Sequence, residues 1–219
     1  MNSEKIRIIL ASKSPRRKEL LENAGFEIVI IPSEAEENID EKDPAEMVKK
    51  LSYLKANSVY ENIANIEGEI DSSYAINTRK TAESGITDKK DDTKSIIVLG
   101  ADTVVYAGGM ILGKPKNKEE AREMIKMLSG NVHSVFTGFT IVQADGKSVT
   151  DYSETKVYVY PMTDEEIEDY ISSNEPYDKA GGYGIQGLFG KYVEKIDGDY
   201  NNVVGLPVSK IIYTLKEIM

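Results

Sequence analysis

The sequence predicts an α/β protein with a mixed β-sheet, flanking helices and two lobes around a central cleft. Three observations carry this prediction. Apolar runs at residues 6–11 and 96–101 have the length and composition of buried strands. Capped amphipathic helices lie between the predicted strands, but without the strict alternation of a doubly wound sheet. The 219 residues suffice for one large domain, or for two lobes that share a core.

The first predicted strand runs into a serine-rich turn at residues 12–14, and a helix leaves this turn. Ser14 is a good N-cap and Pro15 fits the first helical position. Arg16 and Arg17 then fall in the first helical turn, where partial positive charge disfavours cations. A bound anion would explain them, because free N–H groups, hydroxyls and guanidinium groups would converge on phosphate. The alternative is a capped surface helix whose arginines reach solvent or acidic neighbours.

The remaining elements follow from periodicity and turn signals. They are a strand at 26–31, a helix from 44 to about 59, a hairpin of 96–106 and 110–112, a helix at 118–128, strands at 132–142 and 150–160, a helix from 164, a strand at 188–196, a turn at 197–200 and a helix from 207 to about 218. Asp43, Asn117 and Thr163 are predicted N-caps, each followed three residues later by the glutamate of a capping box. Residues 65–95 are polar and lack periodicity, so we expect a mobile surface insertion without catalytic residues.

Four positions have a functional and a structural interpretation. Asp102, expected with Thr103 at the end of the 96–101 strand, needs a lysine, a metal or backbone N–H groups as partner. Lys55 lies at the edge of a helical apolar stripe, where a lysine usually extends to water. The acidic loop 33–38 is either a solvated surface or a metal ligand facing the turn. His133, the only histidine, is more often a hydrogen-bonded structural residue than a catalyst.

The glycine-rich segment 175–187 has too many glycines for regular structure, and such loops often line sites because glycine lets a ligand approach the backbone. Candidate cations, donors and carboxylates are Ser12, Arg16, Arg17, Lys55, Lys114, Lys179, Glu37, Asp102 and Asp178. Together with a divalent metal they suit a triphosphate. Oxygen ligands without cysteine favour Mg²⁺ or Mn²⁺, which positions water for in-line attack while a carboxylate serves as general base. No Walker A motif is present, which excludes a P-loop NTPase.

Composition narrows the class of protein further. The net charge of −10 argues against a general nucleic-acid surface. No apolar stretch approaches the roughly 18 residues of a membrane span, and no signal-peptide pattern opens the chain. The absence of cysteine excludes disulfides, thiolate catalysis and cysteine metal sites, and it fits a reducing cytoplasm. We therefore expect a cytoplasmic protein without membrane or nucleic-acid partners.

Five motifs, in order along nearly the whole chain outside 65–95, resemble the Maf family of nucleoside triphosphate pyrophosphatases. They are Ala11-Ser12-Lys13-Ser14-Pro15-Arg16-Arg17, Gly100-Ala101-Asp102-Thr103-Val104-Val105, Leu112-Gly113-Lys114-Pro115, Leu128-Ser129-Gly130 with His133, and the segment from Asp178-Lys179 to Gly184-Ile185-Gln186-Gly187. The last motif resembles the dTTP/UTP branch. The resemblance implies a single two-lobed domain over residues 1–219, similar in fold to inosine triphosphate pyrophosphatases. It also implies a homodimer, and cleavage of dTTP, UTP or modified pyrimidine nucleotides to the monophosphate and pyrophosphate.

The resemblance also implies roles for individual residues. Asp102 matches the proton acceptor, and Glu37 joins it as a metal ligand. Phosphate-handling positions are matched by Ser12, Arg17, Lys55 and Lys114. Arg16, Thr103 and Gln186 match positions that are linked to substrate choice in the family. The Gln186 amide can both donate to and accept from the edge of a pyrimidine base. Asp178 and Lys179 are further candidates.

Two other functions compete with this hypothesis. One is a regulatory nucleotide-binding protein acting in cell division or septum formation, in which binding matters more than turnover. The other is a nucleic-acid-binding module with Arg16 and Arg17 on phosphate, which the net charge disfavours.

Overall fold

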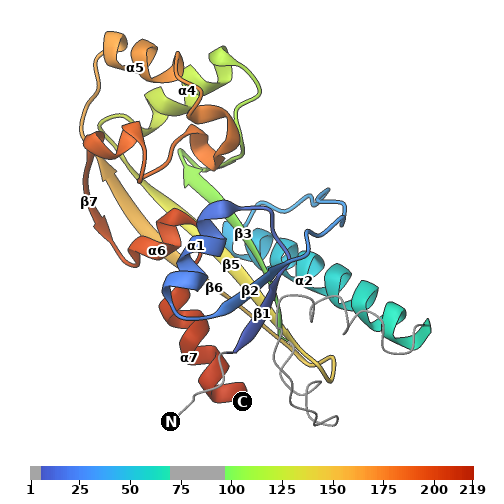
Figure 1. Ribbon diagram of the computed structural model, residues 1–219. Helices are drawn as coiled ribbons and strands as arrows, with labels where there is room; N and C mark the ends of the chain where they lie inside the picture. Colours follow the sequence, from blue (N-terminus) through green and yellow to red (C-terminus); the bar gives the residue numbers. More distant parts are fainter. Residues whose placement is uncertain (1–5, 70–96) are drawn as a thin grey trace, which may run out of the picture.

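A mixed sheet of seven strands runs through the molecule (Figure 1). The structure is a computed structural model that describes residues 6–69 and 97–219. In spatial order the strands are β2 (Glu27–Ile30), β1 (Arg7–Leu10), β3 (Ile97–Ala107), β5 (Val132–Gln143), β6 (Ser148–Val159) and β7 (Val193–Asp197), while β4 (Met110–Leu112) pairs with β3. The β2–β1 and β1–β3 pairs are parallel and the others antiparallel. The predicted mixed α/β fold is confirmed.

Helices cover both faces of the sheet in one lobe (Figure 1). Helix α2 (Pro44–Glu69) packs on one face, and α1 (Pro15–Asn23) and α7 (Val208–Ile218) pack on the other. Because successive strand side chains alternate between faces, Ile8 and Ile9 enter different core clusters. The apolar run of β1 is therefore buried on both faces.

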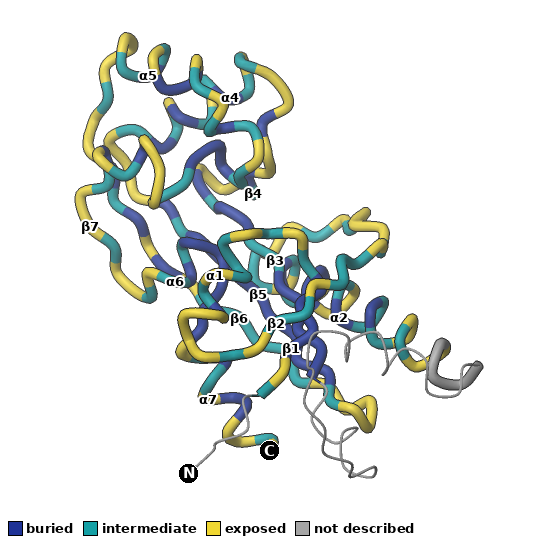
Figure 2. The backbone as a smooth tube through the Cα atoms, in the orientation of Figure 1, coloured by how far each residue is buried: buried dark blue, intermediate teal, exposed yellow. Residues whose placement is uncertain are grey.

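The second lobe is built on the far ends of the long strands (Figures 1 and 2). It contains α4 (Lys118–Leu128), α5 (Asp164–Ile171) and the 3₁₀ turns η1 (Pro176–Asp178), η2 (Ala180–Gly182) and η3 (Leu188–Tyr192). These elements share a buried cluster with strand residues, in which Ile125, Val157 and Phe189 are fully buried. Strands β3, β5 and β6 pass through both lobes, so they fix the position of one lobe relative to the other.

Two glycines let α2 lie unusually close to the sheet. A Cβ atom on Gly100 of β3 would lie 2.3 Å from the Ser52 carbonyl oxygen, and one on Gly138 of β5 would lie 2.3 Å from that of Val48. Neither distance is compatible with a side chain. Gly138 is also the cross-strand partner of Asp102. The close approach therefore brings α2 beside the part of β3 that carries Asp102.

Two expected element boundaries, one of a strand and one of a helix, differ from the structure. Strand β3 does not end at Asp102-Thr103, since both residues keep their pairing with β5 and the strand runs to Ala107. The Asp102 side chain has a lysine partner, so its charge does not interrupt the strand. Helix α2 continues to Glu69, so the start of the expected 65–95 insertion is helical. Residues 70–96 of that insertion lie outside the described residues.

The 188–196 prediction is correct only in its second half. Residues 188–192 form η3, and β7 begins at Val193. Phe189 and Tyr192 are both buried, and their three-residue spacing suits a 3₁₀ turn better than a strand. The turn expected at residues 197–200 leads directly into a short helix, α6 (Tyr200–Val204), capped by Asp199.

The predicted N-caps are confirmed, but only one capping box forms. Ser14, Asp43, Asn117 and Thr163 each accept the backbone N–H three residues ahead. At Thr163 the reciprocal bond from Glu166 is also present. Glu46 instead pairs with Lys49, and Glu120 accepts from the Lys116 backbone N–H. Of the helices described, none is long and apolar enough to cross a bilayer.

Replacing Gly138 by alanine is expected to lower the free energy of unfolding by about 1–3 kcal/mol, because its methyl group would overlap the α2 backbone. Urea unfolding measures the change. Gly113→Ala is the matched control, since no atom lies within 4 Å of the position that its methyl group would take, and it should change stability by less than about 1 kcal/mol. A Gly138→Ala protein as stable as the parent would contradict the close packing of α2.

Candidate active site

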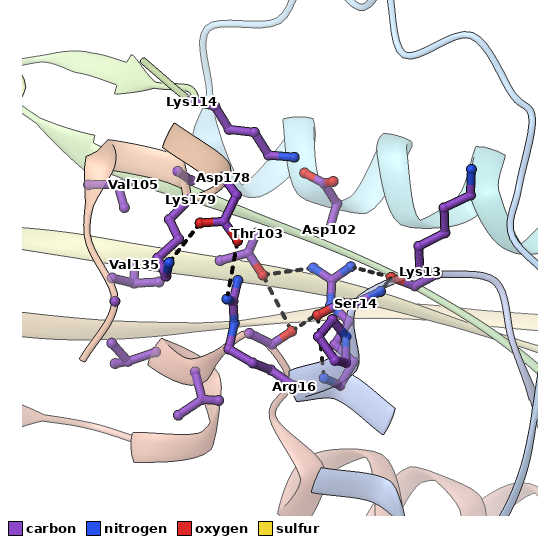
Figure 3. Close-up of a pocket in the computed structure, with 18 of the residues that line it drawn as sticks. Lys13, Ser14, Arg16, Asp102, Thr103, Val105, Lys114, Val135, Asp178 and Lys179 are labelled. Atoms are coloured by element: carbon purple, nitrogen blue, oxygen red, sulfur yellow. Dashed lines mark hydrogen bonds and ion pairs between the residues drawn. The ribbon is translucent and has the colours of Figure 1, made fainter. Parts of the chain in front are cut away.

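A cavity of about 580 Å³ between the lobes brings the predicted site residues together (Figure 3). Its walls come from the serine-rich turn, the acidic loop, α2, β3 and the glycine-rich segment after η1. All eleven candidates line it: Ser12, Arg16, Arg17, Glu37, Lys55, Asp102, Thr103, Lys114, Asp178, Lys179 and Gln186. Residues from opposite ends of the chain therefore face one space large enough for a small ligand.

Lys55 joins the two carboxylates of the site. Its Nζ lies 2.6 Å from Asp102 Oδ1 and 3.1 Å from Glu37 Oε1. The Lys55 and Asp102 side chains are only 13% and 14% exposed, whereas that of Glu37 is 58% exposed. Lys55 thus does not extend freely to water, and it supplies the partner that the partly buried Asp102 requires.

The donor set fits a divalent metal held jointly with a substrate. Within residues 6–69 and 97–219 no group of three or more histidine, cysteine, aspartate or glutamate side chains converges as a metal cage. Glu37 and Asp102 do converge on one cation, the Lys55 ammonium. Mg²⁺ commonly takes one or two carboxylates and completes its shell with phosphate oxygens and water. The two carboxylates therefore suit Mg²⁺ or Mn²⁺ bound together with a phosphate compound.

Arg17 fastens the serine-rich turn to the sheet. Its Nη1 donates to the Ala101 carbonyl oxygen at 2.9 Å and to Ser12 Oγ at 3.2 Å. Its Nε donates to the Gly205 carbonyl oxygen at 2.9 Å, and its Nη2 donates to Thr103 Oγ1 at 3.0 Å. Four of the five guanidinium N–H groups are thus used within the protein. These contacts leave one N–H of Arg17 for an anion, so the main role of Arg17 is to hold the serine-rich turn in position.

Burial and charge act in opposite directions on Arg17. Desolvation lowers the pKa of its guanidinium from the usual value, while the nearby charge of Asp102 raises it. An arginine remains protonated under all ordinary conditions. Arg17 therefore contributes a fixed positive charge directly behind the turn, beside Asp102.

The Thr103 hydroxyl is also occupied within the protein. It accepts from Arg17 and lies 2.9 Å from Thr137 Oγ1, which itself donates to the Asn202 carbonyl oxygen. Since Thr137 uses its single proton on Asn202, Thr103 is the donor in the threonine pair. A role for Thr103 in substrate choice would accordingly act through the position of Arg17.

The opposite wall carries a chain of charges (Figure 3). Arg16 Nη1 lies 3.8 Å from Asp178 Oδ2, and Lys179 Nζ lies 2.7 Å from Asp178 Oδ1. Partial burial raises the pKa of Asp178, but the hydrogen bond and charge of Lys179 outweigh it, with Arg16 adding to the net lowering. Lys114, which follows β4, extends toward Asp102 (Figure 3). Positive groups thus face the cavity from both lobes.

Sequence reasoning missed several residues of the wall. Tyr183, Val105, Val135 and Gly205 all line the cavity. Tyr183 lies within the last of the five motifs, but its partner is 50 residues away: His133 Nε2 lies 2.6 Å from the Tyr183 hydroxyl. This buried contact agrees with the structural interpretation of His133, which lies behind the wall rather than in it.

The comparisons with known proteins give the family. The family model described as Maf-like protein matches residues 7–218. A protein of Agathobacter rectalis named dTTP/UTP pyrophosphatase is 46% identical over 215 residues, covering 96% of this chain and 97% of its own. One of the same name from Thermoanaerobacter sp. strain X514 is 46% identical over 212 residues, covering 96% of each chain. The chain belongs to the Maf family, as its motifs predicted.

Solved structures resemble the chain only weakly. The Ham1 protein of Staphylococcus aureus covers 97% of this chain with all of its own, at 10% identity and a TM-score of 0.48. A nucleoside-triphosphatase, dITP/XTP pyrophosphatase, from Mycobacterium abscessus covers 96% of this chain with 94% of its own, at 9% identity and a TM-score of 0.41. The family assignment depends on the sequence relatives instead.

Desolvation lowers the pKa of His133 to about 4, from an ordinary value of 6.5. The unfolded chain therefore binds a proton as the pH falls below about 6.5, while the folded protein does not until near pH 4. The free energy of unfolding should lose up to roughly 3 kcal/mol across this window from His133 alone.

Proton NMR of the imidazole tests this value directly, since the chain has one histidine. In His133→Gln the decline of stability between pH 6.5 and 4 should be shallower than in the parent protein. An imidazole that titrates near pH 6.5 in the folded protein would contradict its burial behind the cavity.

Proposed function

We propose that this protein is a nucleoside triphosphate pyrophosphatase that hydrolyses dTTP, UTP and modified pyrimidine nucleotides to the monophosphate and pyrophosphate. It would be a hydrolase acting on acid anhydrides. The observation that carries the proposal is the Asp102–Lys55–Glu37 group, which lies in one cavity with the serine-rich turn and its arginines. Relatives at 46% identity over almost the whole chain bear the name dTTP/UTP pyrophosphatase. The cavity combines a carboxylate base with several phosphate-binding cations.

Phosphate binding falls to the cations and hydroxyls of both walls. Ser12 and the remaining N–H of Arg17 face the phosphates from the serine-rich turn, and Lys114 approaches from the other lobe. Guanidinium and ammonium groups stabilise the negative charge that develops on phosphate oxygens during transfer. Because these groups sit on two lobes, a triphosphate is held across the cleft.

Asp102 is the residue that accepts the proton of the attacking water. It projects from a rigid strand, and its contact with Lys55 fixes the orientation of the carboxylate. A positioned general base of this kind contributes about 10²–10⁴-fold to the rate. Glu37 and Asp102 would hold Mg²⁺ or Mn²⁺, which would supply neutralisation of the phosphate charge.

Selection of the nucleotide base falls to Gln186, with Arg16 and Thr103 as further determinants. Gln186 lines the cavity and is solvent-exposed, and within the described chain its side chain forms no protein hydrogen bond. Its amide is therefore available to donate to and accept from a pyrimidine edge. The protein would act in the cytoplasm as a homodimer, without nucleic-acid or membrane partners.

Incubation with Mg²⁺ or Mn²⁺ and each common nucleoside triphosphate tests the reaction. Pyrophosphate and monophosphate should appear in equal amounts from dTTP and UTP, with little product from purine nucleotides. Release of orthophosphate with a diphosphate would overturn the assigned bond. Nucleotide binding without any product would favour a regulatory nucleotide-binding protein of cell division.

Asp102→Asn should lower kcat by at least about 100-fold, because the amide cannot accept the proton from water. The unfolding midpoint should change little. Asp151→Asn is the matched control, since Asp151 also lies on a long strand, 2.7 Å from Lys210 Nζ, but outside the cavity. Wild-type turnover in Asp102→Asn would remove Asp102 from the mechanism.

A further inference from the structure

The segment that carries Gln186, residues 184–188, is held by its backbone. The Gln186 side chain is exposed and forms no hydrogen bond with any described residue, so its own side-chain contacts do not fix its position. The Gly187 N–H donates to the Gly184 carbonyl oxygen at 3.1 Å and closes a local turn. The Leu188 N–H donates at 2.7 Å to Glu175 Oε2. Glu175 is therefore the side chain that attaches this segment to the rest of the lobe.

The other oxygen of the Glu175 carboxylate is bound to the core. Tyr170, a buried residue of α5, shares its single hydroxyl proton between Glu175 Oε1, 3.2 Å away, and the Gly182 carbonyl oxygen, 3.1 Å away. Among the described residues, no lysine or arginine forms an ion pair with this carboxylate, and Lys179 Nζ donates to the Glu175 backbone carbonyl oxygen and to Asp178 instead. The carboxylate thus serves as a double hydrogen-bond acceptor between the core and segment 184–188, rather than as half of a surface ion pair.

Glycine contacts show that the segment lies directly on this support. A Cβ atom on Gly187 would lie 2.3 Å from Glu175 Oε1 and 2.4 Å from Oε2. One on Gly184 would lie 2.8 Å from Lys179 Cε. The φ angle of Gly187 is −101°, which any residue adopts, so a side chain at this position would conflict with the Glu175 carboxylate and not with the backbone conformation. A displacement of the Glu175 side chain would therefore release Gly187 and Leu188, the two residues that follow Gln186.

We propose that Glu175 is a positioning residue that sets selectivity for the nucleotide base by holding the Gln186 segment against the cavity. This inference rests on the proposed function and on the role of Gln186 within it. Glu175 does not line the cavity, and its effect reaches the substrate through segment 184–188. Misplacement of a recognition group by about 1 Å can cost on the order of 100-fold in rate.

Variants of Glu175 separate positioning from mere stability. Glu175→Met keeps much of the side-chain volume but removes both acceptors, and the ratio of kcat/KM for dTTP over dATP should fall at least about tenfold. Glu175→Gln keeps an oxygen for the Leu188 N–H, so the ratio should stay within about fivefold of the parent value. Glu168→Ala is the matched control, because Glu168 bridges α5 to Arg122 in the same lobe without contacting segment 184–188. Equal loss in Glu175→Met and Glu168→Ala, or in Glu175→Met and Glu175→Gln, would overturn the proposal.

A double-mutant comparison tests whether Glu175 acts through Gln186. Adding Glu175→Met to Gln186→Ala should change the dTTP/dATP ratio no further, whereas independent effects would multiply and contradict the proposal. If Glu175→Met does not fold at the assay temperature, Gly187→Ala takes its place in both comparisons, since its methyl group would overlap the Glu175 carboxylate and separate it from the segment.

Assays of the parent protein distinguish a failure of this proposal from a failure of the proposed function. Absence of pyrophosphate release from the parent would refute the enzymatic activity alone. Selectivity is then read from the binding of non-hydrolysable pyrimidine and purine triphosphate analogues to the same variants, with the same expected ratios. Release of pyrophosphate with a ratio unchanged in Glu175→Met would refute the role of Glu175 alone.

Discussion

The close contact between α2 and the sheet is the constraint on which the site depends. Gly100 and Gly138 leave no room for side chains beneath the helix, so the α2 backbone rests on β3 and β5. Lys55 is thereby brought within 2.6 Å of Asp102. A partly buried ion pair of this kind seldom adds much to stability, because desolvation offsets most of the attraction. Its value lies in orientation, since the pair fixes a carboxylate at one place in the cleft.

A second set of contacts joins distant parts of the chain behind the site. Arg17 bonds to carbonyl oxygens of Ala101 and Gly205 and to the Thr103 hydroxyl, so it links the first helix, the central strand and the region after α6. The serine-rich turn is consequently held in place by contacts within the protein itself. Preorganised donors need little rearrangement when charge develops during a reaction. The cleft is thus assembled by fold-wide contacts, while its loops carry the groups that we propose choose the substrate.

Local patterns predicted most of the fold, and the motifs predicted the members of the cavity. The apolar runs of β1 and β3 and the helix caps at Ser14 and Thr163 follow from periodicity and hydrogen bonding within a few residues. The failures came where distant partners decide the outcome. The strand β3 continues through Asp102 because Lys55, 47 residues away, neutralises the charge.

Two further features were beyond the reach of sequence patterns. The segment at residues 188–192 reads as a strand by composition, but Phe189 and Tyr192 enter a core whose shape only the folded lobe defines. The use of Arg17 as an organiser depends on Gly205, 188 residues along the chain. Motifs identify which residues lie together in the cavity. Only the three-dimensional contacts distinguish residues that hold the site in place from residues that are free to bind a ligand.

A double-mutant cycle on Lys55 and Asp102, read as pyrophosphate release from dTTP, measures directly whether the two residues form one reactive unit. If they do, Lys55→Met, Asp102→Asn and the double variant will lose turnover to a similar extent, so the losses will not multiply. Losses that multiply would show that Lys55 acts independently of Asp102. Wild-type turnover in either single variant would contradict the assignment of this pair as the reactive centre.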